Sequence, residues 1–160
     1  MRRLAVLVAS AAALIAAAPA AAQSGRTDDA TKRVVLLSGS EMGTVDCNSL
    51  WVPAIDHLAK MRFSIKGVDQ KFSGGFVTVS SYDSDNNCDV TLGNGAAMDV
   101  ATQAKKFAEW LEKEGRPVDI VAFGTGGLVA RMALGYQGSA GWPGPLPVAS
   151  LKPLARPQTS

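Results

Sequence analysis

The chain has 160 residues, of which 47% are apolar and 19% are charged, and these values are typical of one globular domain. The composition excludes a disordered, collagen-like or coiled-coil chain. The formal net charge is +2, but two of the sixteen basic residues, Arg2 and Arg3, lie in a leader that we expect to be removed. Fourteen basic and fourteen acidic residues then remain, without a basic stripe, so we exclude nucleic acid as a partner.

Residues 1–22 have the pattern of a secretory signal peptide. Two arginines precede an uninterrupted run of apolar and small residues from Leu4 to Ala18, and small residues around Pro19 close it. A membrane anchor is the alternative, but the run is shorter than the roughly 20 residues that span a bilayer. We expect cleavage near Ala22 and a secreted protein, extracellular or periplasmic, without a stable membrane anchor.

The two cysteines, Cys47 and Cys88, favour a disulfide, because an even count in an oxidising compartment points to pairing. Two free thiols are the alternative. Closing a loop of this length stabilises a fold by about 4 kcal/mol in the chain-entropy model, less any strain. The bond would tie the first helix to a loop in the middle of the chain.

The first half of the chain predicts two strands and a helix. Residues 23–32 are polar and form a linker, and the apolar run 34–37 predicts a strand buried on both faces, ended by Ser38-Gly39-Ser40. A helix is expected from Asn48, with Pro53 tolerated only in its first turn. Alternating apolar and polar residues predict a second strand over 76–80.

A polar turn is predicted at residues 83–87, which read Asp83-Ser84-Asp85-Asn86-Asn87. Its acidic residues also suggest a calcium site. A helix-flanked calcium loop needs glycine at its sixth position and glutamate at its twelfth, and neither follows when the count starts at Asp83. We therefore expect no metal here, and no cofactor elsewhere.

The second half predicts a helix over 98–114, a buried strand over 118–123, a turn at Gly124-Thr125-Gly126-Gly127 and a helix over 128–134. Strands alternating with helices predict parallel pairing, with ligand chemistry at the carboxyl ends of the strands. The density of proline and glycine in residues 138–160 predicts an extended or disordered tail.

The segment Val118-Asp119-Ile120-Val121-Ala122-Phe123-Gly124-Thr125-Gly126-Gly127-Leu128 resembles the nucleophile elbow of secreted bacterial lipases and esterases of the α/β-hydrolase fold. In that family a strand enters a glycine-x-serine-x-glycine turn that presents the serine hydroxyl. In this alignment Gly126 and Gly127 match, Ala122 replaces the first glycine, Phe123 replaces histidine and Gly124 replaces the serine. The nucleophile is missing.

The resemblance extends over residues 33–145. The segments around Cys47 and Cys88 resemble the paired-cysteine segments of actinobacterial-type secreted hydrolases, although Ser38-Gly39 replaces the family's histidine-glycine after the first strand. The resemblance implies a three-layer partial α/β-hydrolase domain over 33–137, with a mainly parallel sheet, truncated after the elbow helix. It also implies that the backbone amides of Thr125 and Ser40 are the oxyanion donors.

The rest of the catalytic triad is also missing. In this fold a carboxylate and a histidine base follow the serine, but no histidine, aspartate or glutamate follows Gly124. His57 precedes the elbow and fits a solvent-facing helix position. Thr125 lies one residue beyond the apex and has no partner base. Losing nucleophile and base removes about six orders of magnitude of rate.

Four hypotheses follow. The first is a truncated, degraded lipase-like protein that is catalytically impaired, and the second is a non-catalytic protein that binds a lipid or a small ester. A remote third is nucleotide binding, since Gly124-x-Gly126 follows a strand, although Val129 occupies the third glycine position and no acidic residue follows. The fourth is a partial sheet whose open edge makes it unstable or prone to aggregation.

Overall fold

The structure is a computed structural model that describes residues 32–39, 46–65, 68–81, 87–93 and 98–154. Within these ranges the chain forms a five-stranded sheet of order β5-β4-β1-β6-β7, in which every neighbouring pair is parallel. Its strands are β1 (Arg33–Ser38), β4 (Phe76–Ser80), β5 (Val90–Thr91), β6 (Val118–Ala122) and β7 (Val148–Pro153). The prediction of an α/β fold with a parallel sheet is confirmed.

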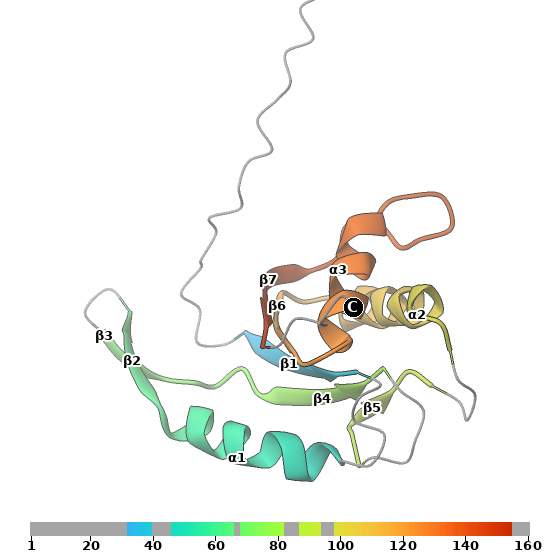
Figure 1. Cartoon of the computed structure of the whole chain (residues 1–160). Helices are drawn as coiled ribbons and strands as arrows, with labels where there is room; N and C mark the ends of the chain where they lie inside the picture. Colours follow the sequence, from blue (N-terminus) through green and yellow to red (C-terminus); the bar gives the residue numbers. More distant parts are fainter. Residues whose placement is uncertain (1–31, 40–45, 66–67, 82–86, 94–97, 155–160) are drawn as a thin grey trace, which may run out of the picture.

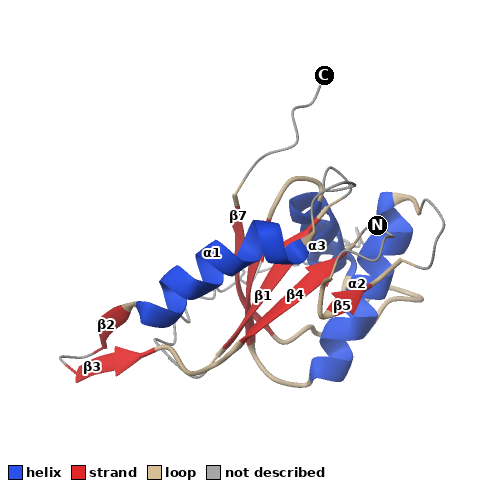
Figure 2. Ribbon diagram, turned by 90° about the horizontal axis from the view of Figure 1, so that it is seen from below, coloured by secondary structure: helices blue, strands red, loops and turns tan. Residues whose placement is uncertain are grey.

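Three described helices cover the two faces of this sheet. Helix α1 (Cys47–Lys60) lies on one face, and α2 (Val100–Glu114) and α3 (Gly126–Tyr136) pack side by side on the other (Figure 1). Figure 2 shows α1 crossing in front of β1 and β4. The described part of the chain therefore has three layers.

The two faces of the sheet bury different amounts of apolar surface, because successive side chains of a strand point to opposite faces. In β1, Val35 and Leu37 face α2 and α3, whereas Leu36 faces α1. The larger cluster joins the sheet to α2 and α3, and its fully buried helical members include Phe107 and Leu111. The cluster under α1 contains Leu36, Cys47, Trp51 and their half-buried neighbours. The main core thus lies between the sheet and α2–α3.

Helix boundaries follow from local capping. The Asp46 side chain accepts a hydrogen bond from the Ser49 amide at 2.6 Å, so α1 begins at Cys47, one residue before the predicted Asn48. Pro53 consequently lies inside the helix, and the prediction that it belongs to the first turn is wrong. Helix α2 begins after Asp99 and ends at Glu114, and Gly115 caps it with a φ of 66°, a left-handed conformation that glycine adopts readily.

A two-stranded antiparallel hairpin follows α1, and the sequence analysis did not predict it. It consists of β2 (Arg62–Ile65) and β3 (Val68–Lys71), and it pairs with none of the strands described in the main sheet. In Figure 1 the hairpin projects beyond the end of α1. Its strands are only four residues long, which is too short for hydrophobic periodicity to reveal them.

The predicted disordered tail contains a strand of the main sheet. Residues 138–154 belong to the described fold, and β7 within them pairs with β6, so neither a disordered segment from residue 138 nor a sheet that stops after the elbow helix is right. Prolines at 143, 145 and 147 shape the connection and precede the strand, while Pro153 lies at the end of an edge strand, where a missing amide is tolerated.

The predicted signal peptide, residues 1–22, and residues 23–31 of the predicted linker lie outside the described residues. Of the helices that are described, none combines the length and the apolar character that a bilayer crossing requires.

Candidate functional site

The candidate site is the turn between β6 and α3, at the carboxyl end of the sheet. The Phe123 amide donates to the Leu37 carbonyl at 2.9 Å, which keeps β6 beside β1 up to the turn. Gly124 then takes a φ of 59°, and α3 begins two residues later at Gly126. The amides of Gly126 and Gly127 donate to the carbonyls of Phe123 and Gly124, both at 3.0 Å. The predicted succession of strand, sharp glycine turn and helix is confirmed.

Gly126 brings α3 into contact with the end of β1. A Cβ atom at this position would lie 2.9 Å from the Leu37 carbonyl oxygen, 3.2 Å from the Ser38 carbonyl carbon and 3.3 Å from the Gly39 amide nitrogen. All three atoms belong to the backbone, so no rotamer change could relieve the contact. Only glycine fits here, and the first turn of α3 therefore rests on the segment that leaves β1.

Two buried serines fix the end of β1. The Ser81 amide and hydroxyl both donate to the Ser38 carbonyl, at 3.1 and 3.0 Å, and the Ser38 hydroxyl donates to the Val79 carbonyl at 3.2 Å. Ser80, which lies between Val79 and Ser81 at the end of β4, is also buried. The buried hydroxyls of Ser38 and Ser81 both have acceptors, and these hydrogen bonds hold the ends of β1 and β4 together. Ser40, the proposed second oxyanion donor, lies outside the described residues.

Thr125 occupies the position between the apex of the turn and the helix. It is half-buried, its φ and ψ of −62° and −18° are helical, and its carbonyl accepts from the Leu128 and Val129 amides at 2.9 Å. The helix begins without a side-chain cap, so its first turn depends on backbone groups. This arrangement leaves Thr125 at the amino end of α3, where helix dipole and amides favour negative charge.

The acid and base groups of a hydrolase do not gather at this turn within the described residues. His57 is exposed on α1, on the face of the sheet opposite α3, as the sequence analysis expected of a solvent-facing helix residue. The described ranges contain no group of three or more histidine, cysteine, aspartate or glutamate side chains suited to hold a metal ion. Residues 83–86 of the acidic turn lie outside those ranges.

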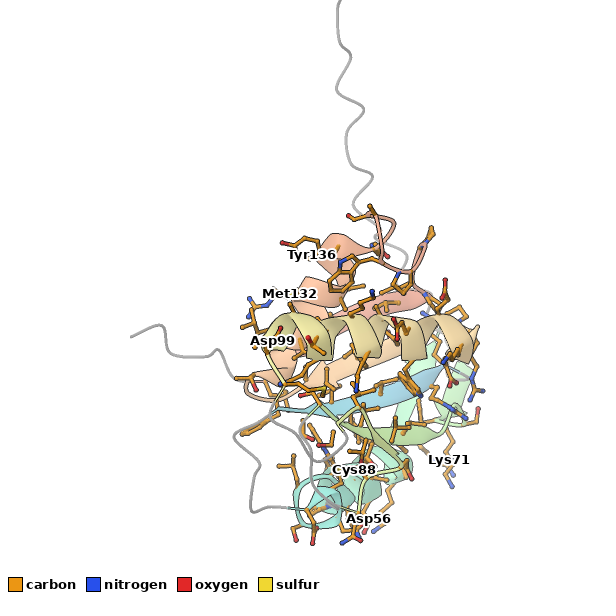
Figure 3. The ribbon with its side chains drawn as sticks, turned by 90° about the vertical axis from the view of Figure 1, so that its right-hand side faces the viewer. Asp56, Lys71, Cys88, Asp99, Met132 and Tyr136 are labelled. Atoms are coloured by element: carbon orange, nitrogen blue, oxygen red, sulfur yellow. A yellow bond between two sulfur atoms is a disulfide. The ribbon has the colours of Figure 1, made fainter. Side chains whose placement is uncertain are left out.

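The disulfide between Cys47 and Cys88 is present, as predicted. Cys47 is buried at the start of α1, and Cys88 lies just before β5, so the bond joins α1 to the edge of the sheet. Figure 3 shows Cys88 on the α1 side of the sheet, whereas Asp99, Met132 and Tyr136 lie on the other side. Hydrogen bonds from the Ser49 amide and hydroxyl lower the pKa of Asp46 below its usual 3.8, which keeps the helix cap ionised.

A cavity between the end of α3 and β7 was not predicted from the sequence. It has a volume of about 550 Å³ and lies between the end of α3 and β7, away from the elbow, with Leu134, Gln137, Leu146 and Leu151 among its lining residues. The sequence did contain an indication of the strand that lines this cavity. The run Val148-Ala149-Ser150-Leu151, between two prolines, predicts a short strand when it is considered apart from the surrounding turns.

No protein-family model, curated protein or solved structure matches this chain.

Proposed function

We propose that this chain is a secreted relative of the lipase and esterase type of α/β-hydrolase, catalytically impaired because glycine stands at the nucleophile position. The observation that carries the proposal is the contact between Gly126 and the end of β1. In the family, the amide after the nucleophile and an amide from the loop after an earlier strand form the oxyanion hole. Here the turn and the segment leaving β1 touch through backbone atoms, with Gly39 nitrogen 3.3 Å from the Cβ position of Gly126.

The conformation of Gly124 supports the same assignment. Its φ of 59° is one that non-glycine residues adopt at a cost, and a strained residue between strand and helix is the hallmark of the nucleophile position. The Gly126 contact also explains the second glycine of Gly124-x-Gly126 by helix packing, so pyrophosphate binding is not needed to account for it.

The first experiment measures hydrolysis of a p-nitrophenyl ester by the mature chain beside a heat-denatured control. We expect turnover far below that of an esterase, because binding and oxyanion donors without nucleophile and base supply at most about 10³ to 10⁴ over water. Efficient turnover by the folded, unmutated chain would contradict the alignment of the elbow.

A second experiment tests the elbow geometry without requiring a base. A p-nitrophenyl phosphonate ester is offered to Gly124→Ser and to Gly144→Ser, whose new side chain has open space and lies far along the chain. The serine oxygen would form a bond to phosphorus and displace p-nitrophenolate, its proton would pass to the buffer, and the two amides would stabilise the charge that develops on the phosphoryl oxygen. We expect Gly124→Ser to react about 10²-fold faster, the scale of one oxyanion donor. Equal rates, read by mass spectrometry, would reject the proposal.

Binding without cleavage is the second candidate, favoured by one observation. Gly124 is buried at the apex of the turn and has no side chain, so the hydroxyl that would cleave a bound ester is absent there. A lipid or small ester would raise the melting temperature of the mature chain, and Gly124→Val would abolish the rise. No shift with short-chain esters or fatty acids would count against this function.

A further inference from the structure

Helix α1 is attached to the sheet mainly at its first turn and a half. Its buried residues are Cys47 and Trp51, and every α1 side chain after Trp51 is exposed or half-buried. Leu50 and Ile55 add partial contacts to the cluster around Leu36. The opposite face of the sheet, in contrast, is covered by two helices with a continuous buried cluster. The α1 side of the sheet therefore buries fewer apolar residues than the α2–α3 side.

Two further features weaken the attachment of α1. Pro53 has no amide hydrogen, so the helix lacks the hydrogen bond that this residue would otherwise donate to the Ser49 carbonyl. The indole nitrogen of Trp51 is buried and has no hydrogen-bond partner among the described residues. A buried donor without an acceptor offsets part of the stabilisation that burying the Trp51 ring provides.

The other end of the disulfide is held firmly by hydrogen bonds that do not involve sulfur. The Asp89 carboxylate accepts from the Thr78 amide at 2.8 Å and from the Thr78 hydroxyl at 2.9 Å. The Asp89 amide donates back to the Thr78 hydroxyl oxygen at 2.9 Å. Because Asp89 follows Cys88 directly and Thr78 lies in the middle of β4, the Cys88 segment stays on the sheet with or without the disulfide.

We propose that the Cys47–Cys88 bond is a redox-operated clasp whose reduction releases α1 while the α2–α3 side of the sheet stays folded. A dithiol reductant supplies two electrons and two protons, the sulfur–sulfur bond breaks, both cysteines become thiols, and the reductant closes to its own disulfide. Cys88 is only half-buried, so attack can start from solvent at its side of the bond. Release uncovers the half-buried ring of Phe123, which directly precedes the Gly124 turn.

Amide hydrogen exchange on the full mature chain, followed by mass spectrometry with and without dithiothreitol, tests this proposal. We expect the amides of residues 51, 52 and 54–60 to exchange at least about tenfold faster after reduction, while those of 103–114 and 129–136 keep their rates. Reoxidation with glutathione disulfide should restore the slow exchange. Unchanged protection of α1 in the reduced chain would overturn the proposal.

The double variant Cys47→Ser/Cys88→Ser distinguishes a disulfide that holds only α1 in place from one that stabilises the whole fold. We expect it to reproduce the fast exchange of α1 without reductant, to keep α2 and α3 protected, and to show no further response to dithiothreitol. Loss of protection in all three helices together, in the variant or in the reduced chain, would also overturn the proposal, because the bond would then stabilise the whole fold.

Discussion

Gly126 lies against Leu37 so closely that a Cβ atom at position 126 would stand 2.9 Å from the Leu37 carbonyl oxygen. The contact joins the first turn of α3 to the last residues of β1, across the parallel pairing of β1 with β6. The fold and the candidate site therefore depend on the same residue, Gly126.

Gly126→Ala should destabilise the chain, since α3 or β1 must shift to admit a methyl group against backbone atoms. Overpacking of this kind costs typically about 1 to 3 kcal/mol. The matched control is Gly135→Ala in the same helix, where a Cβ meets nothing within 4 Å and alanine should stabilise by about 0.5 to 1 kcal/mol. Urea unfolding of both variants measures the difference, and equal midpoints would refute the close contact.

Gly124→Ser should also destabilise, but through backbone conformation. A non-glycine residue in the left-handed region costs about 1 to 2 kcal/mol, and Gly124 has a φ of 59°. Gly144→Ser is the control, because Gly144 has no positive φ and open space for a side chain. Thermal unfolding should show a lower melting temperature for Gly124→Ser alone.

Thr78→Val should destabilise by about 1 to 3 kcal/mol, because the hydroxyl both donates to Asp89 and accepts from its amide. The comparison is Thr91→Val on β5, an exposed position at which we expect less than about 0.5 kcal/mol. Chemical denaturation gives both values. A neutral Thr78→Val would show that Asp89 does not anchor the Cys88 segment.

The caps of α1 and α2 predict a loss of stability in acid. Hydrogen bonds from the Thr102 hydroxyl and amide lower the pKa of Asp99 below 3.8, as those from Ser49 do for Asp46. A carboxylate with a lowered folded pKa stabilises above its unfolded pKa, and this contribution disappears as the pH falls through 3.8 and then through the lowered value. Above pH 5 it is complete.

Asp99→Asn tests whether the Asp99 carboxylate causes part of the loss of stability in acid, because asparagine still caps the helix but does not titrate in this range. Melting temperatures of the variant should fall less steeply than those of the unmutated chain between pH 5 and pH 2. Parallel curves for the two proteins would mean that the Asp99 cap carries no pH dependence.

The helices and central strands were predictable because each has a local signature: apolar runs in β1 and β6, the 3.6-residue period and capping residues of α2, and glycine at the end of α2. The turn at Gly124 was predictable for the same reason. The contact of Gly126 with Leu37 was not, because it joins residues far apart in the sequence. Strand β7 was missed because the prolines and glycines of residues 138–147, which belong to the connection before the strand, and Pro153 at its end hide the periodicity that marks a strand.

One irregularity in β7 bears on how this protein behaves at high concentration. Val148 pairs with Val118 and Ser150 with Asp119, so Ala149 is an extra residue that bulges the strand, and the Ser150 hydroxyl donates to Asp119 at 2.6 Å. A bulge, the charge of Lys152 and the missing amide of Pro153 all discourage a neighbouring molecule from adding a strand there. At the opposite border, β5 is only two residues long. Both borders of the sheet that the described residues form are thus blunted, which opposes the addition of strands from other molecules.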